Sequence, residues 1–148
     1  MTSRDYTTTI RVKATPERAF DAITDVRGWW AGEIEGETAR VGAEFTYRYE
    51  NFHTSKQRVI ELEPAKRVVW QVVESRLNFI ARKDEWNGTR IEFEISRTRD
   101  GSEIRFTHTG LSPDVECFDA CANAWGFLVS KSLRGLIETG KGESRLDV

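Results

Sequence analysis

The sequence holds one histidine in a setting where it could do chemistry, His108 in the segment IRFTHTGL at residues 104–111. Ile104 and Phe106 alternate with polar residues in the two-residue period of a half-buried strand, which places His108 on the apolar side. An imidazole in that position can act as a catalytic base, a metal ligand, a polar anchor for a bound molecule, or a hydrogen-bonded core group. The surrounding residues discriminate among these four roles.

Metal binding and acid–base catalysis both need partners that the sequence does not place beside His108. A zinc site takes three or four ligands, and the only other histidine, His53, falls in an expected turn. Cys117 and Cys121 lack CxxC spacing and are interpreted as small buried thiols. No inward-facing position next to His108 carries a carboxylate, and neither G-x-S-x-G nor a glycine-rich phosphate loop is present. We therefore expect no metal and no cofactor, and we favour a structural or ligand-anchoring imidazole over a catalytic one.

Length and composition predict a single domain over residues 1–148. A chain of 148 residues can bury a full hydrophobic core without crosslinks. The net charge of -2, with basic and acidic residues intermixed, offers no basic stripe for nucleic acid. The first residues carry no apolar run of signal-peptide type and no later segment could span a bilayer, so we expect a cytoplasmic protein without membrane contact. Five Trp and eight Phe indicate a wide, aromatic-rich interior.

The periodicity of apolar residues predicts which segments form strands and which form helices. A first strand at 7–14 precedes a short helix in TPERAFDAITD, with Thr15 as its N-cap and Pro16 at its first position, and then a second short helix with a loop over 26–42. In the segment 114–139, apolar residues recur every three or four positions, which predicts one long amphipathic helix ending at Gly140. Between these helices, apolar and polar residues alternate as in strands, over 44–50, 55–64, 66–74, 89–97 and 102–109. A charged loop is expected at 82–88, and an Asp-Gly hairpin turn at 98–101.

This order of elements predicts an α+β fold. We expect a curved antiparallel β-sheet wrapped around the long C-terminal α-helix, with two short helices after the first strand. A helix against the concave face of a curved sheet leaves either a packed core or a cavity between the two layers.

Three segments carry a resemblance to a known family. TPERAFDAITDVRGWW, KRVVWQVVE after ELEP, and IRFTHTGL followed by AWGFLVSKSLRGLIETGKG resemble the SRPBCC superfamily (START-like or Bet v 1-like, with the helix-grip fold). Within it, they resemble the branch related to activators of the heat-shock-protein-90 ATPase. The resemblance covers nearly the whole chain, in the family's order. It implies a hydrophobic cavity between the long helix and the sheet, open near the loops, that accepts a small apolar ligand.

The phase of the strands and of the helix predicts which side chains would line such a cavity. Each candidate could also simply fill the core, but Trp, Tyr and His carry polar atoms that need partners when buried, which makes them the stronger candidates. Trp30 is expected to close the mouth. The predicted ligand-binding residues are Trp30, Phe45, Tyr47, Phe93, Phe106, His108, Phe118, Trp125 and Leu128.

These features favour a non-enzymatic protein that binds a small, largely apolar molecule, either lipid-like or aromatic. Two alternatives stay open on the resemblance. One is a polyketide cyclase or aromatase-like enzyme, in which His108 or Tyr47 moves a proton within the same cavity. The other is an interaction protein of the chaperone-activator type, which would act through its surface on a chaperone or through a homodimer contact.

Overall fold

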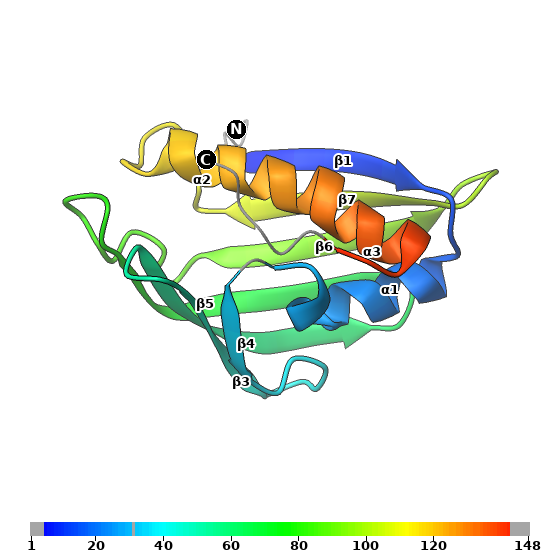
Figure 1. Cartoon of the computed structure of the whole chain (residues 1–148), viewed down its shortest axis with the longest axis horizontal. Helices are drawn as coiled ribbons and strands as arrows, with labels where there is room; N and C mark the ends of the chain where they lie inside the picture. Colours follow the sequence, from blue (N-terminus) through cyan, green and yellow to red (C-terminus); the bar gives the residue numbers. More distant parts are fainter. Residues whose placement is uncertain (1–4, 31, 143–148) are drawn as a thin grey trace.

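The computed structural model describes residues 5–30 and 32–142. In this part of the chain a sheet of seven antiparallel strands is covered on one face by helices (Figure 1). The strands are β1 (Tyr6–Val12), β2 (Glu33–Gly36), β3 (Glu44–Tyr49), β4 (His53–Glu63), β5 (Arg67–Leu77), β6 (Arg90–Arg97) and β7 (Ser102–Thr109). The helical segments are α1 (Pro16–Thr24), the 3-10 turn η1 (Val26–Gly28), α2 (Phe118–Phe127), the π-helical η2 (Leu128–Leu133) and α3 (Arg134–Thr139).

The strand order β1-β7-β6-β5-β4-β3-β2 confirms the α+β helix-grip prediction. The run α2, η2 and α3 crosses the sheet as one long helical body, and α1 packs beside its far end (Figure 1). Register shifts between β4 and β5, at Lys56/Gln57 and Val59/Glu61, mark bulges that add local bend and twist. The sheet can therefore curve around the helix.

Helix α1 begins where the sequence predicts. The Thr15 hydroxyl accepts a hydrogen bond from the Arg18 N–H (3.2 Å), and Pro16 occupies the first turn, where its missing N–H leaves no bond unmade. Ala19 and Ile23 form the fully buried face of this helix. The short helix is thus fixed both by its cap and by the core.

The C-terminal helix differs from the continuous helix expected over 114–139. It starts at Phe118, and its middle widens into π-helical turns at η2. Within η2 the Ser132 hydroxyl donates to the Trp29 carbonyl (2.6 Å), and Leu128, Val129 and Leu133 are buried. Periodicity does not predict such a local unwinding, because it depends on what the helix packs against. The predicted end is confirmed, since Gly140 takes a left-handed φ of 84°.

Two further expectations are corrected. Residues Glu33–Gly36, expected within a helix and loop, form the edge strand β2, where Ile34 pairs with Tyr47. The segment EIEG has a single apolar residue, so it carries too little alternation to be detected. His53, expected in a turn, is the first residue of β4 and pairs with Tyr49 and Leu77.

The core lies between the helical layer and the concave face of the sheet. Trp29, at the end of η1, stacks on Trp70 of β5 and meets Phe93 of β6 edge-on. All three side chains are fully buried or nearly so. Among the helices in residues 5–30 and 32–142, none combines the length and the hydropathy of a membrane-spanning segment.

Candidate functional site: an aromatic cavity

A cavity of about 330 Å³ lies between the C-terminal helical body and the β3–β4 side of the sheet. Glu50, Phe52 and Phe79 are exposed members of its lining and mark where it opens to solvent. The helical body contributes small and apolar side chains, the sheet contributes aromatic ones, and the connecting loops complete the wall. The lining consists of Ala120, Cys121, Ala124, Trp125 and Leu128, of Tyr47, Tyr49 and His53, and of Trp30, Glu50, Phe52, Phe79 and Trp86.

Five of the lining side chains form a closed circuit of ring contacts, which we term the five-ring cage. The centroid separations are 4.2 Å for Trp30–Tyr47, 5.0 Å for Tyr47–His53, 4.4 Å for His53–Trp86, 5.9 Å for Trp86–Trp125 and 5.1 Å for Trp125–Trp30. Trp30 stacks on Tyr47, and Trp86 stacks on Trp125, while His53 meets its two neighbours edge-on. Because each ring is held by two others, the cage is a preorganised aromatic wall.

Two buried polar atoms of this cage have no hydrogen-bond partner within the described part of the chain. They are Nε2 of His53 and Nε1 of Trp86. Burial lowers the pKa of His53 to about 3, although the residue as a whole is only half-buried, so its imidazole is neutral near pH 7. Both atoms are packed out of reach of solvent, and the indole of Trp86 lies against the thiols of Cys117 and Cys121.

His108 lies directly behind the cage and is fully buried. Its Nδ1 lies 3.0 Å from Nε1 of Trp125, and its Nε2 lies 2.9 Å from Oγ1 of Thr89. The Thr89 hydroxyl also lies 2.7 Å from the carbonyl oxygen of Trp86 and donates to it. His108 thus links helix α2, strand β7 and the segment that carries Trp86.

This network determines the protonation of the ring. An indole N–H can only donate, so Nδ1 of His108 is an unprotonated acceptor, and Nε2 carries the hydrogen and donates to Thr89. The pKa of His108 is lowered to about 3, mainly by burial and next by His53, with Asp5 opposing. Both ring nitrogens are already engaged, so His108 serves here as a buried support for Trp125.

The loop that carries Trp86 is tied to the start of α2 by two glutamates. The Glu85 carboxylate accepts from the N–H groups of Glu116 (2.7 Å) and Cys117 (3.0 Å). The Glu116 carboxylate accepts from the N–H groups of Ala81 and Arg82, which lowers the pKa of Glu116. Glu85 belongs to the charged loop expected at 82–88, and in the structure it satisfies backbone donors next to the helix start.

The two cysteines are free and buried, as their interpretation as small thiols predicts. The Cys121 thiol hydrogen-bonds the Cys117 sulfur at 2.7 Å, and this bond together with burial raises the pKa of Cys121. Cys121, which lines the cavity, therefore stays a protonated, weakly polar group near pH 7. Within the described chain no three His, Cys, Asp or Glu side chains are grouped to hold a metal ion.

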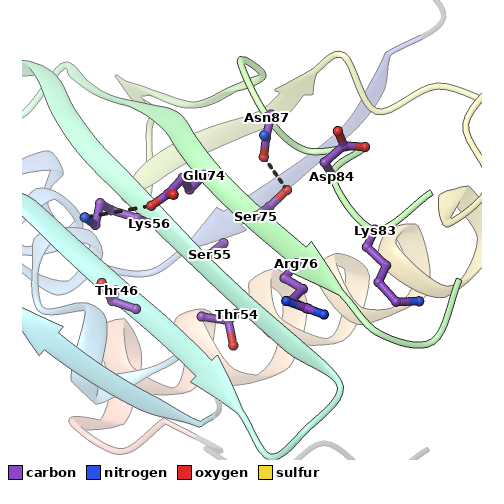
Figure 2. Close-up of a pocket in the computed structure, with 10 residues that line it drawn as sticks. All are labelled: Thr46, Thr54, Ser55, Lys56, Glu74, Ser75, Arg76, Lys83, Asp84 and Asn87. Carbon is purple, nitrogen blue, oxygen red and sulfur yellow. Dashed lines mark hydrogen bonds and ion pairs between the residues drawn. The ribbon is translucent and has the colours of Figure 1, made fainter. Parts of the chain in front are cut away.

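A second hollow, of about 500 Å³, lies on the other face of the sheet over β4 and β5 (Figure 2). Thr46 and Lys56 lie in it because they alternate with inward-facing neighbours. It is a polar groove in which Lys56 lies 3.9 Å from Glu74 and Ser75 bonds Asn87 at 2.9 Å. It has no aromatic wall among the described residues, so the five-ring cage is the stronger candidate site.

The structure divides the predicted site residues into two groups. Trp30, Tyr47, Trp125 and Leu128 line the cavity. The others lie in the surrounding core: Phe45, Phe93, Phe106 and His108 are buried there, and Phe118 packs against it while partly exposed.

Sequence reasoning missed nine lining residues, including some that are in phase on regular elements, such as Tyr49 and Cys121. Trp86 is the clearest case, because it is only 3% exposed although it sits in the charged segment RKDEWNG. A tryptophan in an otherwise polar loop was the available signal. The residues missed are Tyr49, Glu50, Phe52, His53, Phe79, Trp86, Ala120, Cys121 and Ala124.

Comparison with known proteins agrees with this fold. The family model for activator of Hsp90 ATPase homolog 1-like protein matches residues 13–138. The chain therefore belongs to this family, a branch of the SRPBCC superfamily. A search of curated proteins finds no match.

Several solved structures are similar to the chain. The Aha1 dimer from Colwellia psychrerythraea is 28% identical, with a TM-score of 0.73 over 93% of this chain and 98% of that one. Protein SSP2350 from Staphylococcus saprophyticus is 18% identical, with a TM-score of 0.71 over 96% and 97% of the two chains. DynU16, a protein of the dynemicin biosynthetic locus, is 17% identical, with a TM-score of 0.70 over 99% of this chain and 51% of that one. The last two likenesses establish the fold alone.

Proposed function

We propose that the protein binds a small, largely apolar molecule in the aromatic cavity. The observation that carries this proposal is a cavity of about 330 Å³ that opens to solvent and is walled by the five-ring cage. Ligand sites typically measure about 300 to 1,000 Å³ and combine apolar walls with a few placed polar groups. The carboxylate of Glu50 at the mouth is the polar group placed beside this apolar wall.

The cyclase-like alternative finds less support in the same geometry. A proton moved by His108 would require breaking its bond to Trp125 or to Thr89, and His108 itself is fully buried behind the cavity. Burial raises the pKa of Tyr47, so its phenol stays protonated and is a poor base near pH 7. Binding without proton transfer is the role that these two side chains fit best.

The neutral fluorescent probe N-phenyl-1-naphthylamine tests the proposal. We expect one probe to bind per chain and to quench tryptophan emission, because Trp30, Trp86 and Trp125 line the cavity. Fluorescence titration gives the affinity, and native mass spectrometry gives the stoichiometry. Failure of this probe and of a broad lipid and aromatic library to form any adduct would favour an interaction protein with a merely unfilled core.

A further inference from the structure

The described lining of the cavity includes an acidic side chain and no positively charged one. Of the described residues that line it, Glu50 is the one with a carboxyl group, and no lysine or arginine is among them. Arg76 and Lys83, which flank Phe79 in the sequence, line the outer groove instead (Figure 2). A ligand entering the cavity therefore meets a negative group at the mouth and no positive one.

Glu50 is held at the mouth by the backbone of the β3–β4 turn. It takes a left-handed φ of 48°, and the Phe52 N–H donates to the Tyr49 carbonyl (3.1 Å) to close the turn around it. Its side chain is exposed, and within the described residues its carboxylate makes no ion pair or hydrogen bond. The carboxylate is available to a ligand.

The five-ring cage has the same electrostatic preference. The faces of aromatic rings are negative, so they attract cations, tryptophan most strongly, and they oppose an anion placed over them. Trp30 is stacked between Tyr47 and Trp70, which leaves Trp86 and Trp125 as the tryptophans of the cage that are not stacked on both faces by described residues. His53 adds no positive charge near pH 7, because burial keeps its imidazole neutral. An anionic head group would lose its hydration here and find no counter-ion.

We propose that the preferred ligand has an apolar body and a cationic head, such as a quaternary or alkyl ammonium group, held by the five-ring cage and by Glu50. This inference rests on the proposed binding function and specifies its ligand class. It also excludes fatty acids and other apolar carboxylates as preferred ligands.

Three probes that share one naphthalene body test the inference on the whole chain by competition with N-phenyl-1-naphthylamine. They are (2-naphthylmethyl)trimethylammonium, its neutral carbon isostere 2-neopentylnaphthalene, and the carboxylate naphthalene-2-acetate. We expect the cation to bind at least about tenfold more tightly than the carboxylate, a difference within the range of desolvated cation–π contacts. The variant Glu50→Gln should weaken the cation about two- to fivefold, as expected for a partly exposed ion pair, and leave the neutral isostere unchanged.

The variant Glu94→Gln is the matched control. It removes the same charge from an exposed position on β6 that does not line the cavity, so the affinity of the cation should not change. Carboxylate affinity equal to or above that of the cation would overturn the inference and leave the proposed binding function standing. Equal losses of cation affinity in Glu50→Gln and Glu94→Gln would likewise overturn the inference and leave the proposed binding function standing. If N-phenyl-1-naphthylamine and all three probes fail to bind, the binding function and this inference fall together.

Discussion

At pH 4.5, the free energy of unfolding is expected to be about 3 kcal/mol lower than at pH 7 because of His108 alone. In the folded protein the pKa of this ring is lowered to about 3, chiefly by burial, whereas in the unfolded chain it is near its ordinary 6.5. The unfolded chain therefore binds the proton more strongly. The stabilisation is complete above pH 6.5, declines as the pH falls toward 3, and levels off below that.

Urea denaturation of the natural protein and of His108→Gln, each at both pH values, isolates this contribution. A glutamine amide can accept from Trp125 and donate to Thr89 without titrating, so it replaces both bonds of the neutral ring. The pH dependence of the variant should be smaller by about 3 kcal/mol, since His53 and the carboxylates remain in both proteins. At pH 7, His108→Leu should cost about 1 to 3 kcal/mol, because it leaves Trp125 and Thr89 unpaired. An unchanged pH dependence in a folded His108→Gln protein would contradict the neutral buried network.

The fold could be predicted because its main signals are local. The alternation in β6 and β7, the Asp-Gly turn between them and the Thr15 cap of α1 each depend on residues close in the sequence. The edge strand β2 and the π-helical η2 could not be predicted, because pairing with β3 and packing against Trp29 determine them. Those contacts join residues that are distant in the sequence.

The candidate site could be predicted only where it lies on regular elements. The strand and helix phases select Tyr47 and Trp125, which line the cavity, but the same phases also select Phe93 and Phe106, which are buried in the core. The position of a residue in the repeat of its strand or helix predicts which face of that element the side chain occupies. It does not predict whether a cavity lies next to that face. Trp86 enters the site through the Glu85 contacts with the start of α2, which are tertiary and leave no periodic signal.

The buried network and the cavity are coupled through Trp125. Its indole nitrogen is fixed by His108, and its ring is the wall of the cage shared with Trp30 and Trp86. A ring held in this way does not have to be ordered when a ligand arrives, which lowers the entropic cost of binding. The inward-facing histidine of IRFTHTGL therefore contributes to the proposed site by positioning, without touching the ligand.

Filling the cavity from its helical wall should abolish most of the binding without unfolding the protein. Ala124 is half-buried on α2 and lines the cavity, so the phenyl ring of Ala124→Phe would occupy space that the ligand needs. We expect the affinity for N-phenyl-1-naphthylamine to fall at least about tenfold, since that loss corresponds to about 1.4 kcal/mol of binding free energy. Unfolding by urea should change by less than about 1.5 kcal/mol, because the added ring enters a void and not a packed core.

The matched control introduces the same side chain one residue earlier. Asn123 is exposed on α2 and lies outside the lining, so Asn123→Phe adds an aromatic ring to the same helix without reducing the cavity. Its affinity for the probe should equal that of the natural protein, and far-ultraviolet circular dichroism should show the same mixed helix and strand content for all three proteins. If folded Ala124→Phe binds the probe as tightly as Asn123→Phe does, the probe occupies some other surface, and the cavity between the helix and the sheet is not the binding site.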